Sequence, residues 1–307
     1  MQGATPRHGA PSGASPSSLS PSAGLTVVIG AGPAGSACAL WLHQLGCPVL
    51  LVDRNAQAGG LQQFSPYENL WIPSIRGLRG QDIAGRLHEH LQAAGVPMRL
   101  GLAVEHVEPR AQGGFRIACA DASVLECGFA VIATGARFKT GGFTPGERLS
   151  IGPGRDFEAV DVQGKSVAVL GGGDNAFDAY RFAMARGAVR CRIFARTLRA
   201  QHKLQALVGL ENVQTGPFTV DAPSFKVNGE AFDVISVQFG FEPVVPGGLQ
   251  DLERSHEGYL KADLWGVTGV QGLYAAGEVT HTLHPCVTTS LAHGVQVAKH
   301  IQGCLGL

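Results

Sequence analysis

Two short glycine-rich stretches have the residue types and the spacing that bind phosphate groups. Residues 30–35 follow the apolar run 25–29 and read G-x-G-x-x-G, while residues 171–176 follow the run 166–170 and read G-x-G-x-x-A. A turn of this kind after a strand brings backbone N–H groups and the N-terminus of the next helix to a pyrophosphate. The chain therefore carries two candidate dinucleotide sites.

The first turn is flanked by the elements that such a site requires. Residues 34–45 predict a helix that Gly46 ends, and residues 48–52 predict a second strand that leads into Asp53. An acid about 20 residues after the turn can accept hydrogen bonds from ribose hydroxyls. This succession favours dinucleotide binding over a turn that serves packing alone. Further along, residues 115–136 are expected to form two strands joined by a short turn.

The second turn differs from the first in the residues that come after its second strand. A helix is predicted over residues 177–186 and a strand over residues 189–194. This strand does not end in an acid but is followed by Arg196 and Arg199. Arginine there can pair with the 2′-phosphate of NADPH, whereas an acid would accept from the 2′-hydroxyl of NADH. The pattern favours NADPH; in the alternative, NADH binds and both arginines are merely solvated.

Composition argues against several classes of function. Lys+Arg and Asp+Glu number 24 each, so no net charge would attract nucleic acid. No apolar run is long enough to span a bilayer, so no membrane segment is expected. The seven cysteines lack C-x-x-C spacing, which predicts no disulfide framework and fits the reducing cytoplasm. Residues 1–24, rich in Ser, Pro, Gly and Ala, are expected to form a disordered tail.

A metal site is not expected. His281, His284, Cys286 and His293 are of metal-binding types, but residues two apart, such as His284 and Cys286, do not share a helix face. Upstream, the aromatic side chains of Tyr67 and Trp71 are interpreted either as neighbours of a cofactor or as core residues.

Six motifs occur in an order that resembles a known family. They are GAGPAG at 30–35, GG at 59–60, ENLW at 68–71, ATGA at 133–136, GGGDNA at 171–176 and LYAAGEV at 273–279. The chain is similar to the two-dinucleotide flavoproteins of the pyridine nucleotide-disulfide oxidoreductase superfamily, and most similar to the low-molecular-weight thioredoxin reductase branch. In that superfamily the first turn binds FAD and the second admits a reduced nicotinamide cofactor, which here would be NADPH or NADH.

The resemblance implies an α/β fold of two Rossmann-like, doubly wound domains with parallel central sheets. The FAD-binding domain would be discontinuous, over residues 25–138 and 240–307. The NAD(P)H-binding domain, residues 139–239, would be inserted between these parts and would be trimmed, with a hairpin around Asn228-Gly229.

The resemblance and the turns together assign the cofactor-binding residues. The expected contacts are Gly30, Gly32, Pro33, Ala34, Gly35, Asp53, Arg54, Gly60, Asn69, Thr134, Gly135, Gly171, Gly173, Asp174, Asn175, Ala176, Arg196, Arg199, Gly277, Glu278, Pro285, Cys286 and Val287. Glu278 stands where the family usually has an aspartate that binds the ribityl chain. The following helix would begin near Pro285, bury Val287, Leu291, Val295 and Ala298, and point its N-terminus at the flavin.

The redox cysteines of the branch are missing. Thioredoxin reductases carry C-A-T-C before the second turn, but residues 154–157 occupy that place here without a cysteine, and the first helix contains only Cys38. The expected function is therefore an FAD-dependent NAD(P)H oxidoreductase without a redox dithiol, and the resemblance implies a homodimer. Its acceptor would be a small molecule or a small redox protein: ferredoxin or flavodoxin, a quinone, oxygen or an external disulfide.

Two rival interpretations and one candidate catalytic residue complete the sequence-based view. The chain could be a non-catalytic flavin-binding sensor or scaffold, or a nicotinamide-dependent dehydrogenase without flavin.

Cys286 is the one thiol that the resemblance places near the flavin. If the helix begins at Pro285, Cys286 lies in its first turn, where free N–H groups favour a thiolate. The alternative is a small buried residue whose backbone alone serves the cofactor.

Overall fold

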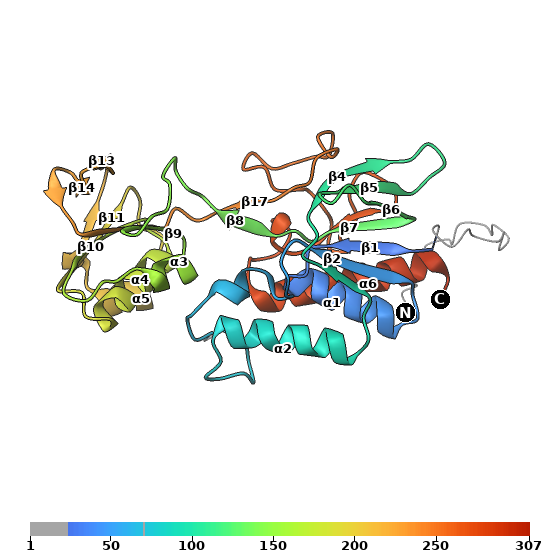
Figure 1. Cartoon of the computed structure of the whole chain (residues 1–307), viewed down its shortest axis with the longest axis horizontal. Helices are drawn as coiled ribbons and strands as arrows, with labels where there is room; N and C mark the ends of the chain where they lie inside the picture. Colours follow the sequence, from blue (N-terminus) through green and yellow to red (C-terminus); the bar gives the residue numbers. More distant parts are fainter. Residues whose placement is uncertain (1–23, 70) are drawn as a thin grey trace, which may run out of the picture.

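The computed structural model describes residues 24–69 and 71–307. Apart from Gly24, the tail expected over residues 1–24 lies outside the described residues. Within the described part, no helix combines the length and the apolarity needed to cross a membrane. Two α/β units lie side by side along the long axis of the molecule (Figure 1). They are called here the first unit, which contains β1, and the second unit, which contains β10.

The first unit is built on a parallel sheet of five strands. These are Thr26–Ile29 (β1), Val49–Asp53 (β2), Met98–Leu100 (β3), Phe129–Ile132 (β7) and Leu273–Ala275 (β18). The sheet order is β18-β7-β1-β2-β3, so the chain runs outward from β1 and then crosses to its other side. Ligands bind parallel sheets at such a reversal, outside the carboxyl ends of the strands. The first glycine turn follows β1 at this point.

Helices cover one face of this sheet and a small antiparallel sheet covers the other (Figure 1). The helices are Pro33–Gln44 (α1), Gly80–Ala93 (α2) and Val287–Leu305 (α6). The antiparallel strands are Val104–Pro109 (β4), Phe115–Cys119 (β5) and Val124–Cys127 (β6). Cys38 and Leu42 of α1 are buried in one core with Val297 and Ile301 of α6, which fixes both helices on the sheet.

The expectation of two strands over residues 115–136 was wrong, because three strands occur there. Ala122, with φ of 65°, turns the chain between β5 and β6. The N–H of Gly128 donates to the carbonyl oxygen of Leu25, and the next residues enter the parallel sheet as β7 beside β1. The apolar run therefore serves two different sheets, and no local pattern marks the change.

The second unit has its own parallel sheet of five strands. These are Leu149–Ile151 (β9), Ser166–Leu170 (β10), Arg190–Ala195 (β11), Val213–Thr215 (β12) and Val234–Val237 (β16), in the order β12-β11-β10-β16-β9. Its helices are Arg155–Ala159 (α3), Asp174–Ala185 (α4) and His202–Val208 (α5). Since β18 of the first sheet follows all these strands along the chain, the second sheet is inserted into the first unit. The predicted fold class is confirmed.

The hairpin predicted around Asn228-Gly229 is confirmed. It joins Lys226–Val227 (β14) to Glu230–Ala231 (β15), and Val220–Asp221 (β13) completes a three-stranded antiparallel sheet. Asn228 and Gly229 have φ of 50° and 80°, as a two-residue hairpin turn requires.

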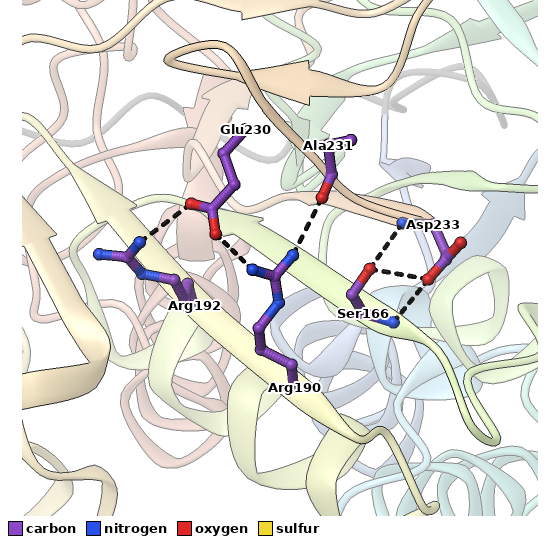
Figure 2. A network of polar contacts seen from close by, with 6 residues as sticks. All are labelled: Ser166, Arg190, Arg192, Glu230, Ala231 and Asp233. Atoms are coloured by element: carbon purple, nitrogen blue, oxygen red, sulfur yellow. Dashed lines mark hydrogen bonds and ion pairs between the residues drawn. The ribbon is translucent and has the colours of Figure 1, made fainter.

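Polar contacts tie this hairpin to the parallel sheet (Figure 2). Glu230 binds both Arg190 and Arg192, the latter at 2.9 Å, and Oδ2 of Asp233 accepts from the N–H of Ser166 at 2.8 Å. Ser166 is the first residue of β10, whereas the second glycine turn follows the last. The network therefore stabilises the end of the sheet that lies away from the turn.

Two strands link the units. Ala136–Phe138 (β8) leaves the first unit, Phe241–Pro243 (β17) returns to it, and the two pair antiparallel between the units (Figure 1). In the described part of the chain there are also three short 3-10 helices, at Gly60–Phe64 (η1), Leu210–Asn212 (η2) and Gly277–Val279 (η3).

Candidate functional site: two glycine turns and two connected clefts

The glycines of each turn fall into two kinds. A β-carbon on Gly30 would collide with the carbonyl oxygen of Ala133, and one on Gly171 with that of Gln238. These first glycines are therefore required by the neighbouring strand. A β-carbon on Gly32 would meet only the Cα of Gly60, at 3.8 Å, and one on Gly173 would meet no protein atom within 4 Å.

The second glycine of each turn, Gly32 or Gly173, is therefore not required by contacts within the protein. Gly32 has φ of −70° and Gly173 has φ of −97°, values that any residue adopts. Neither packing nor backbone conformation explains glycine at these positions, but a ligand that lies against the backbone does. Both turns therefore leave open space against the backbone, as a turn that binds a pyrophosphate requires.

The first turn opens on a cleft of about 720 Å³ in the first unit, here the first cleft. The predicted residues that line it are Gly30, Gly32, Pro33, Ala34, Asp53, Arg54, Gly60, Thr134, Gly135, Glu278 and Val287. Further lining residues, which the sequence did not single out, include Asn55, Gln62, Phe64 and Ser290. A neighbouring hollow of about 730 Å³ shares Gly30, Asp53, Arg54 and Thr134 with it and lengthens the site.

Asp53 is held against the first turn. Its Oδ2 accepts a hydrogen bond from the N–H of Ala31 at 2.6 Å, and its Oδ1 accepts from the N–H of Asn55 at 2.7 Å. The residue is buried, with 8% of its surface exposed. Each carboxylate oxygen can accept a second bond, so the predicted contact with ribose hydroxyls is compatible with this arrangement.

The second turn opens on a larger cleft of about 1590 Å³ between the units, here the second cleft. The predicted residues that line it are Asn69, Gly173, Asp174, Asn175, Arg199, Glu278, Pro285, Cys286 and Val287. Trp71, Phe241, Tyr259 and His281 line it as well. Glu278 and Val287 belong to both clefts, so the two hollows meet at these residues.

The segment after β11 is fixed on the second turn by four hydrogen bonds. The carbonyl oxygen of Gly172 accepts from the N–H groups of Arg199, at 2.7 Å, and of Ala200, at 2.9 Å. The carboxylate of Asp174 accepts from the backbone and the side chain of Gln201, at 2.8 and 2.9 Å. This anchoring brings Arg199 to the second cleft, whereas Arg196 does not line it. Within residues 24–69 and 71–307, neither guanidinium forms an ion pair.

Glu278 stands in η3 where the two clefts meet. No described residue donates a hydrogen bond to its carboxylate, and burial raises its pKa above the ordinary value of 4.5. A hydrogen bond from α6 fixes the start of η3, because the N–H of Gly277 donates to Nδ1 of the buried His293 at 3.2 Å. Burial lowers the pKa of His293, which favours the neutral ring that this bond needs.

Helix α6 begins later than the sequence suggested. Its first helical residue is Val287 rather than Pro285, and Cys286 is the N-cap with an extended backbone. The thiol accepts from the N–H of Thr289 at 3.5 Å and lies 3.2 Å from its hydroxyl oxygen. A capping side chain satisfies an N–H group that the helix leaves free, so the cap rather than the proline sets the start.

The predicted buried stripe of α6 was also wrong in part. Val287 and Ala298 are buried, but Leu291 and Val295 are only partly so, and Gly294 faces the core between them. A side chain at Gly294 would collide with the carbonyl oxygen of Ala34, so α6 turns this small residue toward α1. Close packing of the two helices thus overrides the pattern of large apolar residues.

Comparison with known proteins decides the family. Residues 25–298 match the family described as pyridine nucleotide-disulphide oxidoreductase. The chain belongs to this family. Thioredoxin reductase of Bacillus subtilis is 25% identical over 300 residues, which cover 90% of this chain and 93% of that protein. NADH dehydrogenase of the same organism is 26% identical over 89% of this chain and 57% of that protein. Thioredoxin reductase of Lactococcus lactis, in its FR conformation, has a similar fold, with a TM-score of 0.78, 23% identity and coverage of 92% and 99%.

As a pyridine nucleotide-disulphide oxidoreductase of the thioredoxin reductase-like branch, the chain is an FAD-dependent NAD(P)H oxidoreductase. The predicted enzyme class and the cofactors FAD and NAD(P)H are thereby confirmed. The open cradles at Gly32 and Gly173 fit these two dinucleotides. The C-x-x-C pair of the branch is absent from the sequence.

Five predicted contacts of this oxidoreductase line neither cleft: Gly35, Gly171, Ala176, Arg196 and Gly277. Gly35 and Gly171 pack on neighbouring backbone, and Ala176 is buried under the second turn.

Trp71 is 65% exposed and lines the second cleft, so the core interpretation of this residue was wrong. The polar Ser290 of α6 was missed. It lies on the buried face one turn before Gly294, a position that signals a cleft rather than a core.

Metal binding has no geometric support in the part of the chain that the structure describes. No three His, Cys, Asp or Glu side chains there gather closely enough to hold an ion. Three of the four candidates near the C-terminus make other contacts: His293 binds Gly277, His281 stacks on Tyr259 at 3.5 Å between ring centroids, and Cys286 caps α6.

Proposed function

We propose that the chain passes electrons from NADPH, through FAD bound in the first cleft, to an acceptor outside the chain. The observation that carries this proposal is that two open glycine cradles lead into two clefts that meet at Glu278 and Val287. Hydride transfer needs both cofactors close together, and connected clefts provide that. FAD supplies a store for two electrons when it is bound.

The residues that would hold FAD are those of the first cleft. Gly32 leaves room for the pyrophosphate, Asp53 accepts from ribose, and the N-terminus of α6 faces the cleft through Val287. A helix N-terminus stabilises negative charge, which accumulates on a reduced flavin. Glu278 would bind the ribityl chain or hold a proton beside it, because burial raises the pKa of its carboxyl group.

NADPH would bind along the second turn, on the unit of residues 139–239. Gly173 gives room for its pyrophosphate, and Arg199 at the cleft is placed to pair with a 2′-phosphate. NADH remains the alternative donor in this proposal, because one relative is the NADH dehydrogenase of Bacillus subtilis.

The acceptor would be external, because the chain lacks the C-x-x-C pair of its branch. Candidates are ferredoxin or flavodoxin, a quinone, oxygen and an external disulfide, and assembly as a homodimer is part of the proposal. Of the cysteines in the described chain, only Cys286 lines either cleft. We include its thiolate in the proposal as the group that would attack an external disulfide, which breaks the S–S bond, forms a mixed disulfide with Cys286 and releases one thiol. Two electrons from NADPH, by way of FAD, would then release the second thiol and restore Cys286.

Anaerobic stopped-flow mixing with NADPH tests the function. The purified protein should be yellow, its flavin should bleach within seconds, and bleaching with NADH should be slower. Adding each acceptor class to the reduced protein then identifies the one that restores the colour fastest. A yellow protein that neither nucleotide bleaches would contradict the proposal and support a non-catalytic flavin-binding protein. A colourless protein that oxidises an alcohol with a nicotinamide cofactor would support the dehydrogenase without flavin.

A further inference from the structure

The segment 60–67, between β2 and α2, has two faces. Gly60, Leu61, Gln62 and Phe64 line the first cleft on one side. On the other side, Phe64 and Tyr67 contact the second unit, although they belong to the first. The segment is therefore both a wall of the flavin site and a docking surface.

Aromatic contacts make up this docking surface. The ring of Tyr67 meets that of Phe182, on α4, edge to face, with 5.2 Å between centroids and 89° between planes. Phe182 in turn packs on Phe157 of α3 at 5.8 Å and lies under the guanidinium of Arg186 at 5.2 Å. Edge-to-face pairs at such separations are among the preferred arrangements of aromatic rings.

A second contact lies beside the first. The guanidinium of Arg155, the first residue of α3, stands over the ring of Phe64 at 5.3 Å. A β-carbon on Gly154 would come within 2.8 Å of the carbonyl oxygen of Phe64. Residues 154–157 take the place that the redox dithiol has in the resembled branch. Here that place is filled by a packing contact that leaves no room for a cysteine side chain at position 154.

We propose that Tyr67 and Phe64 are positioning residues, which hold the second unit so that the second turn faces the first cleft. Tyr67 lines neither cleft, whereas Phe64 lines the first cleft and also contacts Arg155 of the second unit. They act through α3 and α4, and α4 begins directly after Gly173. The covalent links between the units are β8 and β17, two single strands, so side-chain contacts are needed to fix the orientation. This inference rests on the proposed function, since orientation matters only if NADPH reduces the flavin.

The proposal makes different predictions for the aromatic ring of Tyr67 and for its hydroxyl group. Its hydroxyl oxygen is buried and has no hydrogen-bond partner within the described residues, and burial raises its pKa. A buried hydroxyl without a partner contributes nothing favourable, whereas the ring contributes the contact. A positioning role therefore requires the ring and not the hydroxyl.

The experiment compares Tyr67→Phe, Tyr67→Ala and Phe182→Ala with Phe218→Ala as a matched control. Phe218 pairs with Phe194 inside the second unit, at 6.2 Å, and does not touch segment 60–67. FAD content, the NADPH dissociation constant and the rate of anaerobic flavin reduction are measured for each. Hydrogen exchange of peptides covering 60–67 and 153–160 reports docking independently of activity.

We expect Tyr67→Phe and Phe218→Ala to reduce their flavin within twofold of the natural rate. Tyr67→Ala and Phe182→Ala should keep FAD and bind NADPH normally, yet be reduced at least tenfold more slowly, and their combination should add no further loss. Both should exchange faster at 60–67 and 153–160. Tyr67→Ala with the natural rate and exchange would overturn the proposal, and so would Tyr67→Phe as slow as Tyr67→Ala.

A failure of the proposed function can be distinguished from a failure of the positioning role of Tyr67. If NADPH does not reduce the natural protein, the function fails, and hydrogen exchange alone decides whether Tyr67 holds the units together. If Tyr67→Ala does not fold, Phe182→Ala, with its substitution on the other unit, carries the same test.

Discussion

Gly32 and Gly60 lie next to each other in the wall of the first cleft, and a β-carbon on Gly32 would stand 3.8 Å from the Cα of Gly60. The protein therefore has room for a side chain at position 32, and its backbone allows one. A larger residue there would displace the ligand rather than any part of the protein.

Gly32→Val should yield a folded but colourless protein, because the side chain would occupy the place of the pyrophosphate. The absorption spectrum and the melting temperature of the purified variant check this. Gly269→Val is the matched control, since Gly269 is exposed, has open surroundings and lines neither cleft. A yellow Gly32→Val protein would show that the flavin binds elsewhere.

Arg199→Ala should weaken NADPH binding and leave NADH nearly unchanged. A charge-assisted pair with the 2′-phosphate contributes about 1.5–3 kcal/mol, which corresponds to a roughly ten- to hundredfold change in affinity. Arg196→Ala, outside the second cleft, should have the smaller effect. Dissociation constants for both nucleotides decide the matter. Equal losses for NADPH and NADH would exclude recognition of the 2′-phosphate.

Glu278→Gln should change the pH dependence of stability. Burial raises the pKa of the folded carboxyl above 4.5, so the stability that the protonated group contributes is complete below about pH 4.5. It is lost as the pH rises through the raised value. Glutamine cannot ionise, and the variant should therefore gain stability over the natural protein as the pH rises to neutrality. Thermal unfolding from pH 4 to 8 measures this, with the exposed Glu89→Gln as control. A difference that does not grow with pH would contradict it.

Cys286→Ser should preserve helix α6, because serine is a favoured N-cap and can accept from the N–H of Thr289. FAD content and reduction by NADPH should therefore be unchanged. NADPH-driven reduction of small disulfides should be lost, together with any long-wavelength flavin absorbance that depends on a thiolate. A variant that reduces disulfides normally would leave Cys286 as a helix cap and move the search for the acceptor site elsewhere.

The sequence predicted the features that local spacing determines. The strand, glycine turn and helix succession and the turn at Asn228-Gly229 follow from a few adjacent residues, and the structure has them in place. Long-range packing set the rest. Residues 115–136 divide between two sheets because β7 pairs with β1, and α6 turns Gly294 inward because α1 lies against it. The contact of Tyr67 with Phe182 joins distant segments, and no local pattern could announce it.

The most direct test of the account is the anaerobic reduction of Gly173→Val by NADPH. Position 173 has no protein atom within reach of a β-carbon, and its backbone accepts valine, so the variant should fold and stay yellow. The added side chain would fill the second cradle alone. The account predicts that its flavin bleaches at least a hundredfold more slowly than in the natural protein, while dithionite still reduces it fully. Bleaching at the natural rate would show that the second turn does not hold the hydride donor, and would contradict the central claim.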